Sequence, residues 1–459
     1  MSPASPAGVV MKFGGTSVAD ADAMTRVVNI VRSQRESQAH ATPPVVVVSA
    51  LSKVTDGLIR TAEFARHGDG KAAGALLVEL LERHCAIART LTSGGRAEDL
   101  VKALQTQFAE LGGRVVALAS VKKVAPADHD MIVAMGELAS SQIVAAAFAE
   151  QGLPAVWVDS RSVLVTDAEH MAAMPDMDAT CARMRERVVP ATARGEIPVL
   201  GGFIGATAAG VTTTLGRGGS DYSASIFGAC IGSGEIQIWT DVDGMLTADP
   251  RVVPAPRLVP RLSFAEASEL AYFGAKVLHP STILPAVSKN IPVRILNSRR
   301  PENPGTLITA EGRPGGALAA LACKRDVTVI DITSSRMLMA HGFLRRLFEV
   351  FERFKTAVDV VTTSEVSVSV TVDDVRRLDE IVENLRAFSE VACEPKMAIV
   401  SVVGERLLEE PALFGKAIVA LGHVPLRLVS QAAARRNITF VIRDADVTEA
   451  MTRLHDAFF

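Results

Sequence analysis

The first 300 residues alternate short apolar runs, rich in β-branched residues, with longer helical patterns, and this alternation is the strongest constraint on the fold. A strand followed by a helix, repeated many times, is the order that parallel strands with helical crossovers require. We therefore predict an α/β fold, an αβα sandwich in which helices cover both faces of a mainly parallel sheet. The predicted strands are residues 9–13, 45–49, 155–158, 197–203, 235–240 and 292–296, and the helical patterns between them include residues 56–90 and 131–150.

The rhythm changes after a proline- and glycine-rich segment at residues 301–316. Beyond it, the order strand, helix, strand, strand, helix occurs over residues 327–388 and again over residues 398–457. Such a repeat favours a ligand-binding or dimerising module over a simple packing domain. The predicted domains are a catalytic domain at 8–310, a linker at 311–320, and two smaller units at 321–395 and 396–459.

Composition excludes several classes of protein. The formal net charge is −3 and no basic block occurs, so we predict no contact with nucleic acid or with a membrane. The first eight residues do not have the pattern of a signal peptide, so we expect a cytoplasmic protein. The cysteines are odd in number and scattered, which favours free thiols over a disulfide framework or a zinc site. They are Cys85, Cys181, Cys230, Cys323 and Cys393.

Residues 11–18 read M-K-F-G-G-T-S-V and follow a β-branched run, so they are predicted to form a strand-to-helix turn. Gly14 and Gly15 would let backbone N–H groups approach an anion closely, and the next helix adds the positive end of its dipole. Lys12 would add a fixed positive charge. The alternative is an ordinary turn with a surface lysine, and the chain has no P-loop pattern.

A second candidate segment, residues 212–221, reads T-T-T-L-G-R-G-G-S-D. Its glycines make the backbone pliable around Arg217, whose planar guanidinium can hold a carboxylate through two hydrogen bonds. Asp221 opens an apolar helical stretch, so it is either a site residue or only a helix N-cap.

Glu137 is the only charged residue between positions 131 and 148. In a buried helix, its ionised carboxylate would need a cation or strong hydrogen-bond donors. The alternative is a polar stripe, shared with Ser141, that faces water. A carboxylate and a guanidinium together suit the ammonium and carboxylate of an amino acid, so the sequence predicts an amino-acid substrate.

Residues 238–251, I-W-T-D-V-D-G-M-L-T-A-D-P-R, place acidic turns after a predicted strand. Loops at the carboxyl ends of strands are common ligand sites in open α/β sheets. Downstream, Lys276 is a candidate second cation for a phosphate. For His279, a structural hydrogen bond at a helix end is the favoured interpretation.

Taken together, these segments closely resemble the aspartate kinase (aspartokinase) family. The matching motifs are K-F-G-G-T-S at 12–17, V-S-A-L-S-K-V-T at 48–55, G-E-L at 136–138, T-T-T-L-G-R-G-G-S-D at 212–221, W-T-D-V-D-G at 239–244, T-A-D-P-R at 247–251 and F-G-A-K-V-L-H-P at 273–280. The resemblance implies an amino-acid-kinase domain followed by two tandem ACT domains of the ferredoxin-like type. It also implies that ATP phosphorylates the side-chain carboxylate of L-aspartate, giving 4-phospho-L-aspartate, the first step of lysine, threonine and methionine biosynthesis.

The resemblance further implies a role for each matching residue. Lys12 and Asp221 would be catalytic, with Asp221 orienting Lys12. The residues implied to bind aspartate are Thr55, Glu137, Arg217, Gly218, Gly219 and Ser220. Those implied to hold ATP are Lys12, Phe13, Gly14, Gly15, Thr240, Asp241, Leu246, Arg251, Lys276 and Val277, where Leu246 replaces a tyrosine that packs near adenine in some relatives. Mg²⁺ is expected to arrive mainly through the phosphates and water, because no metal-ligand spacing stands out.

The C-terminal half resembles the effector region of lysine-sensitive aspartokinases. The residues implied to bind L-lysine are Met337, Gly342, Phe343, Leu344, Asp359, Ser364 and Glu365, with Asp359 meeting its ammonium. The resemblance implies a monofunctional enzyme that forms a homodimer or homotetramer through its ACT domains. Two other functions stay open, another amino-acid kinase such as a glutamate kinase, and a non-catalytic lysine sensor. Threonine as the effector also stays open.

Overall fold

The chain folds into two compact units, each described here by itself. The computed structural model describes residues 8–37, 42–274, 278–313, 318–334, 341–405, 407, 409–431 and 436–459. The first unit comprises Met1–Met245 and Val277–Ala310, and the second comprises Leu246–Lys276 and Glu311–Phe459. The predicted boundary after residue 310 coincides with one edge of this division. The segment Leu246–Lys276, which the sequence placed within the catalytic domain, packs with the second unit.

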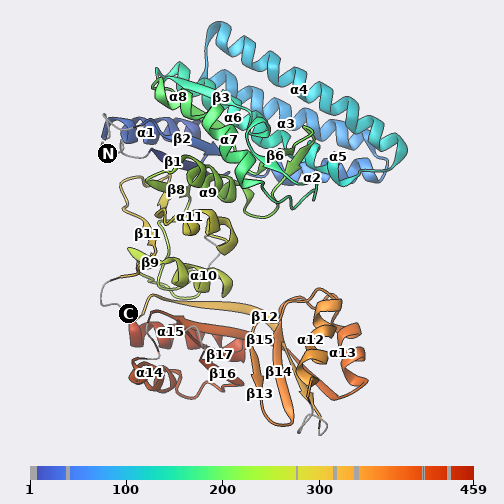
Figure 1. Cartoon of the computed structure of the whole chain (residues 1–459), viewed down its shortest axis with the longest axis vertical. Coiled ribbons are helices and arrows are strands. Elements are labelled where there is room, and N and C mark those ends of the chain that lie inside the picture. Colours follow the sequence, from blue (N-terminus) through green and yellow to red (C-terminus); the bar gives the residue numbers. More distant parts are fainter. Residues whose placement is uncertain are drawn as a thin grey trace. The chain divides into compact units, whose positions relative to one another are not determined.

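The first unit is built on a twisted, mainly parallel sheet, as the sequence predicted (Figure 1). Its strands are rich in valine and isoleucine and mostly buried, which is typical of a sheet covered on both faces. Only the pairing of the last two strands is antiparallel. In spatial order the strands are β3 (Ala155–Val158), β5 (Ile197–Gly201), β2 (Val45–Val48), β1 (Val9–Phe13), β8 (Glu235–Thr240), β10 (Val293–Asn297) and β11 (Thr306–Thr309).

Helices cover this sheet, and two long ones, α3 and α4, pack along each other (Figure 1). The helix predicted over 56–90 is two helices, because the chain turns at Gly68 with φ of 83° and Asp69 then caps α3 through the N–H of Ala72. The helices are α1 (Ala21–Ser37), α2 (Val54–Arg66), α3 (Gly70–Leu91), α4 (Gly94–Val121), α5 (Pro126–Val133), α6 (Met135–Glu150), α7 (Met177–Arg187), α8 (Val189–Ala193), α9 (Gly219–Ile231) and α11 (Leu284–Ser288).

A small second sheet in the same unit was not predicted as a separate element. It consists of β4 (Val165–Thr166), β6 (Ile204–Thr207) and β7 (Thr212–Thr214), in the order β4-β6-β7. β6 and β7 form an antiparallel pair, and β7 leads directly into the glycines around Arg217. This sheet therefore presents the second candidate segment to the site.

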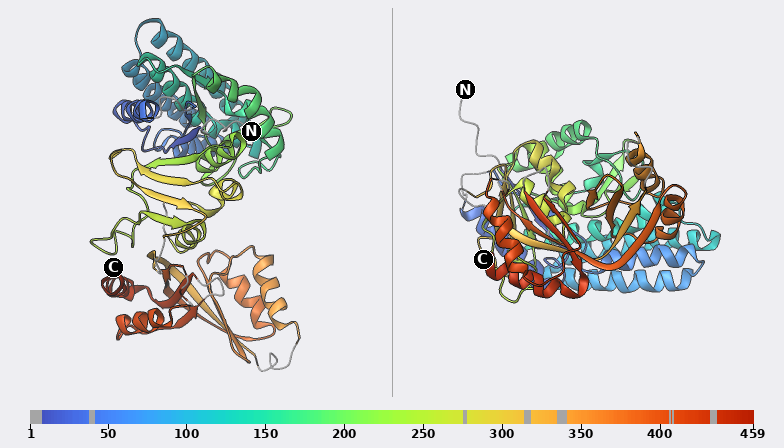
Figure 2. Two further views of the ribbon diagram at one scale, coloured as in Figure 1. Left: turned by 60° about the vertical axis from the view of Figure 1, so that its left-hand side comes forward. Right: turned by 90° about the horizontal axis from the view of Figure 1, so that it is seen from below.

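The second unit contains a six-stranded sheet with helices at its two ends (Figures 1 and 2). Two long strands, β12 (Ala320–Thr333) and β15 (Glu390–Val403), pair along their length, so both βαββα repeats share them. The sheet order is β13 (Val361–Thr363), β14 (Ser367–Val372), β12, β15, β17 (Asn437–Arg443) and β16 (Leu428–Gln431). The remaining elements are β9 (Arg261–Ser263), α10 (Phe264–Tyr272), α12 (Phe343–Arg353), α13 (Leu378–Arg386), α14 (Pro411–Leu421) and α15 (Val447–Phe458).

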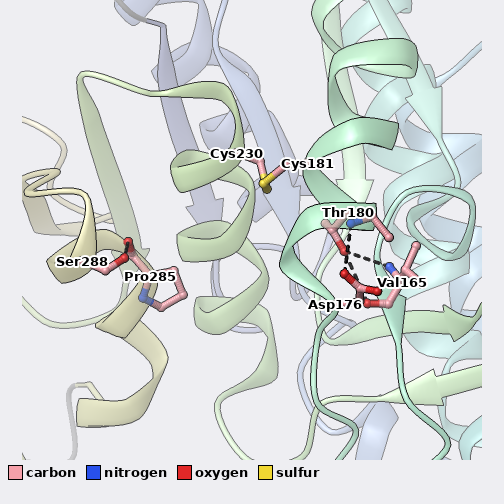
Figure 3. Close-up of a disulfide and its surroundings, with 8 residues drawn as sticks. Val165, Asp176, Thr180, Cys181, Cys230, Pro285 and Ser288 are labelled. Atoms are coloured by element: carbon pink, nitrogen blue, oxygen red, sulfur yellow. Dashed lines mark hydrogen bonds between the residues drawn. A yellow bond between two sulfur atoms is a disulfide. The ribbon is translucent and has the colours of Figure 1, made fainter.

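The prediction that all cysteines are free thiols is wrong for one pair. Cys181 on α7 and Cys230 on α9 form a disulfide, with their Cα atoms 4.6 Å apart (Figure 3). The two residues are 49 positions apart in sequence, and only the packing of α7 against α9 brings them together. Among the described residues Cys85, Cys323 and Cys393 remain free.

One helical stretch, Pro126–Glu150, is long and apolar enough by composition to cross a membrane. It is interrupted at Ala134, where α5 ends and α6 begins. Within this fold 89% of its most apolar window is buried, as in the core helix of a globular domain. Its apolar character is therefore used in packing against the sheet and the neighbouring helices.

Candidate active site

The candidate site begins with an ion pair at the carboxyl end of the central strand β1. Lys12 Nζ lies 2.7 Å from Asp221 Oδ1, and only 10% and 16% of the two side chains are exposed. Asp221 lies in the first turn of α9, whose N-cap is Gly218, so Asp221 is not the N-cap that the alternative interpretation required. An ammonium has three donors, and a single carboxylate contact leaves others for an incoming anion.

The glycine turn after β1 lies against two neighbouring loops. The N–H of Gly14 donates to the carbonyl of Trp239, and the N–H of Ser52 donates to that of Gly15. A Cβ atom on Gly15 would lie 3.0 Å from the carbonyl oxygen of Ala50, which leaves no room for a side chain. Phe13 is fully buried and stacks on Trp239. The turn is therefore held by backbone contacts, as a phosphate-binding turn requires.

Glu137 projects from the first turn of α6 and is 3% exposed, so the alternative of a stripe facing water is excluded. Burial raises the pKa of Glu137 to about 8, against the opposing effects of the backbone N–H groups of Ala50 and Glu137 and of the Lys12 charge. Its Oε2 has no hydrogen-bond partner in the described part of the chain. The expected cation and donors are therefore nearby, as the Lys12 charge and two backbone N–H groups, but burial outweighs them. The site keeps a buried carboxyl group with an unused oxygen, which suits an incoming cation.

Two glycines that were not predicted as site residues, Gly201 and Gly202, allow the first turns of α6 and α9 to pack against the end of β5. A Cβ on Gly201, at the end of β5, would lie 2.9 Å from the backbone oxygen of Glu137. A Cβ on Gly202 would lie 2.8 Å from the Cα of Ser220. The start of α6 and the start of α9 therefore both pack on the same strand end. The signal in the sequence was a glycine pair directly after a buried apolar run.

Arg217 occupies the tip of the loop between β7 and α9 and is exposed. Gly216 and Gly218 on either side have φ of 75° and 73°, values that favour glycine. Gly219 is buried, and a Cβ there would lie 2.6 Å from the ring of Phe203. The half-buried Ser220 and Thr55 lie in the first turns of α9 and α2.

The predicted nucleotide residues are divided between the two units. Thr240 and Asp241 follow β8 in the first unit, where the N–H and hydroxyl of Ser298 both donate to the Thr240 carbonyl. Leu246 and Arg251 belong to the second unit. There Leu246 forms a β-bridge with Leu258, and Arg251 pairs with Asp249 at 2.6 Å. Lys276 and Val277 lie outside the described residues.

Comparison with known proteins identifies the family. The profile of the amino acid kinase family matches residues 8–297, and an ACT domain profile matches residues 400–458. Lysine-sensitive aspartokinase 3 of Escherichia coli is 34% identical, over 98% of this chain and 99% of its own length. The chain belongs to the aspartokinase family.

Other aspartokinases give the same result. The chloroplastic aspartokinase 3 of Arabidopsis thaliana is 34% identical over 98% of this chain and 81% of its own length. The structure of E. coli aspartokinase III in complex with lysine and aspartate superimposes with a TM-score of 0.81 at 33% identity, covering 98% of this chain and 99% of that one. The family activity is that of an aspartate kinase, a phosphotransferase, and it agrees with the predicted fold and function.

The predicted effector residues lie in the second unit, around a buried carboxylate. Asp359 precedes β13, and its side chain is 1% exposed. Lys324 Nζ lies 2.7 Å from Asp359 and 2.7 Å from Asp373, and the hydroxyl of Tyr272 donates to Asp359 at 2.9 Å. Burial lowers the pKa of Lys324, but its hydrogen bonds to the two aspartates outweigh this and raise it. The carboxylate expected to meet an effector ammonium therefore already holds one.

The other effector residues are at the ends of nearby elements. Gly342 is the N-cap of α12 with φ of 85°, and Phe343 and Leu344 begin that helix. The hydroxyls of Ser364 and Ser367 are 2.6 Å apart in the turn between β13 and β14, beside the exposed Glu365. Met337 lies outside the described residues.

Proposed function

We propose that the side-chain carboxylate of L-aspartate attacks the γ-phosphorus of ATP in line, at the Lys12–Asp221 pair. The single observation that carries this proposal is that ion pair, located where the glycine turn of β1 meets the N-terminus of α9. The attacking carboxylate is already ionised at neutral pH and needs no general base. Catalysis then depends on positioning and on neutralising charge on the phosphoryl oxygens. Lys12 and the N–H group of Gly15 supply that positive potential, and Gly14 keeps the turn free of a side chain.

The amino-acid end of aspartate binds between two groups of opposite charge. Arg217 holds its α-carboxylate, and Glu137 accepts its α-ammonium. The raised pKa of Glu137 means that burial outweighs the nearby Lys12 charge, so the substrate ammonium adds the positive charge that favours ionisation. Thr55, Gly218, Gly219 and Ser220 complete this pocket with hydroxyl and backbone groups.

ATP enters as its magnesium complex. Mg²⁺ prefers oxygen ligands and keeps several waters, so the phosphates and the exposed carboxylate of Asp241 after β8 suit it. When bound, the ion neutralises charge on the phosphates. Phe13, Thr240, Asp241, Leu246, Arg251, Lys276 and Val277 are the remaining residues proposed to hold the nucleotide.

A substrate panel tests this function. The purified protein is incubated with MgATP, hydroxylamine and either L-aspartate or L-glutamate, because an acyl phosphate product is trapped as a hydroxamate. We expect hydroxamate with aspartate and at least a hundredfold less with glutamate. A preference for glutamate would make the protein a different amino-acid kinase. Lysine binding by calorimetry with no hydroxamate from either substrate would make it a sensor.

We propose feedback inhibition by L-lysine at the second unit. The support is the carboxylate of Asp359, which already binds an ammonium, and the N-terminus of α12 after Gly342, which no side chain of the described residues caps and which suits a carboxylate. Lysine-sensitive aspartokinase 3 and the lysine-bound E. coli structure are relatives of the same length. Adding lysine or threonine to the hydroxamate assay decides between the two effectors.

The oligomeric state, the domain limits and the cellular location are also proposals. We propose a homodimer or homotetramer formed through the ACT units, with the domain limits 8–310, 321–395 and 396–459 and a linker at 311–320. Light scattering with and without lysine measures the assembly state. We also propose that the enzyme is cytoplasmic.

A further inference from the structure

A buried aspartate outside the predicted site joins the two elements that carry Glu137 and Arg217. Asp130 lies on α5, and its side chain is fully buried. It accepts hydrogen bonds from Thr214 Oγ1 at 2.7 Å, from His170 Nδ1 at 2.8 Å and from the N–H of Met171 at 3.0 Å. Burial raises its pKa, but the His129 ring 4.0 Å away and the hydrogen bonds from Thr214, Met171 and His170 outweigh this and lower it. Asp130 is therefore ionised, and its negative charge is stabilised by hydrogen bonds from groups within the fold.

The first end of this connection is the helix of Glu137. Asp130 precedes Glu137 by seven residues, about two helical turns, on the apolar stretch that continues from α5 through Ala134 into α6. α6 is fixed in turn by the close approach of Gly201 to the backbone of Glu137. The two helices are joined at Ala134, whose N–H donates to the carbonyl of Asp130 and whose carbonyl accepts from the N–H of Leu138, so a displacement of Asp130 would shift the start of α6 and Glu137 with it.

The second end is the loop of Arg217. Thr214 is the last residue of β7, three positions before Arg217, and its carbonyl accepts from the N–H of Ala173. Gly216 packs on the same segment, since a Cβ there would lie 3.1 Å from the carbonyl oxygen of Met171. Met171 has φ of 70°, a strained value for this residue type that the hydrogen bond to Asp130 supports.

We infer that Asp130 and Thr214 are positioning residues that set the spacing between Glu137 and Arg217 and thereby the affinity for the amino-acid end of aspartate. This inference rests on the proposed function, in which those two groups grip the substrate. Neither positioning residue touches the substrate. Preorganised side chains bind more tightly because the ordering is completed before the ligand arrives.

The test uses the hydroxyl of Thr214, because Thr214→Val keeps the shape of a buried side chain and removes one hydrogen bond to an ionised group. We expect the KM for aspartate to rise about tenfold, with kcat and the KM for ATP within about twofold, because the loop of Arg217 loses a hydrogen bond to an ionised group. Thr214→Ser should restore the KM. The matched control is Thr213→Val, on the same strand, which loses a bond to Thr166 instead and should keep the wild-type KM.

A double-mutant cycle separates positioning from general loosening of the fold. Arg217→Ala should raise the KM for aspartate, and Thr214→Val should add little to it, because the hydroxyl acts through Arg217. Fully additive effects, or an unchanged KM in Thr214→Val, would overturn the inference while leaving the substrate site intact. An unchanged KM in Arg217→Ala would overturn both the inference and the proposed substrate site.

Discussion

The two units each contain a lysine–aspartate pair at 2.7 Å, and the two pairs differ in what else surrounds the ammonium. Lys12 contacts one carboxylate, that of Asp221, beside a turn of backbone N–H groups. Lys324 lies between Asp359 and Asp373 and over the ring of Tyr272. The first ammonium has more capacity left for a ligand, whereas the second already contacts two carboxylates of the chain itself.

The difference indicates how the same pair serves two purposes. A catalytic ammonium must meet new negative charge on the phosphoryl group, so its own carboxylate should orient it without using all of its donors. A carboxylate that binds an effector can be held by an internal ammonium until the effector competes for it. Binding there therefore requires rearrangement, which is what coupling to a distant site needs.

The largest effect is expected from removing the ammonium in the first unit. Lys12→Met should lower the rate of single-turnover phosphoryl transfer by about 10³-fold, because it deletes a preorganised positive charge at the transferring group. The control is Lys396→Met, which breaks an exposed lysine–aspartate pair and should leave the rate unchanged. An unaltered chemical step with only weaker ATP binding would remove Lys12 from its catalytic role.

A second comparison concerns covalent stabilisation, which among the described residues is confined to the first unit. The Cys181–Cys230 disulfide closes a segment with a sequence separation of 49 residues, so Cys181→Ser should reduce the free energy of unfolding by about 2–4 kcal/mol. Denaturant unfolding of the oxidised protein measures this loss.

The control for the disulfide is Cys393→Ser, which replaces an exposed free thiol in the second unit and should change little. Treatment of the wild-type protein with dithiothreitol should reproduce the effect of Cys181→Ser. Equal stability of oxidised and reduced protein would show that the bond adds nothing to the fold.

A smaller effect is expected from removing the carboxylate of Asp359, the predicted contact of the effector ammonium. Asp359→Ala should keep turnover in the absence of lysine and raise the lysine concentration for half-inhibition by about 5- to 150-fold, the usual range of coupling between sites. Inhibition curves at fixed aspartate and ATP measure this shift. The matched control is Asp326→Ala, which removes an exposed aspartate paired with Lys396. Inhibition at the wild-type concentration would place the effector site elsewhere.

Sequence reasoning succeeded where a local pattern decides the structure. The strands at residues 9–13, 155–158 and 235–240 are observed with the predicted bounds, because short runs rich in β-branched and aromatic residues favour strands. It failed where tertiary packing decides. The partnership of Cys181 with Cys230 and the bonds of Asp130 to Met171 and Thr214 all join positions 40 or more residues apart.

The candidate site shows the same division. Lys12, Glu137 and Asp221 were recognisable as unusual residues in their segments, and the structure brings them to one sheet edge. The protonation of Glu137 was not predictable, because it depends on how completely the helices exclude water. The sharing of β12 and β15 between the repeats was also hidden, since each half of a long strand resembles a separate strand in the sequence.

The smallest effect concerns Glu137, a buried carboxyl group that, unlike Asp359, forms no lysine ion pair within the described part of the chain. Its folded pKa of about 8 lies above the ordinary value of 4.5, so the free site is mainly protonated at pH 7. Aspartate brings the cation that favours ionisation, so its apparent affinity should rise about fivefold from pH 7 to pH 8, in proportion to the ionised fraction. Calorimetric titration with aspartate measures both this change and the release of a proton on binding.

Glu137→Gln is the variant that isolates this carboxyl group. It should bind aspartate weakly, with no pH dependence in this range and no proton release. The same linkage acts on folding with the opposite sign, because the native chain holds a proton that the unfolded chain lacks between about pH 4.5 and pH 8. The free energy of unfolding of the ligand-free wild-type protein should therefore fall as the pH rises from about 4.5 to 8, and this fall should be smaller in Glu137→Gln. Identical pH profiles for the two proteins would mean that Glu137 is ionised in the free site and that its cation comes from the chain, as it does for Asp359.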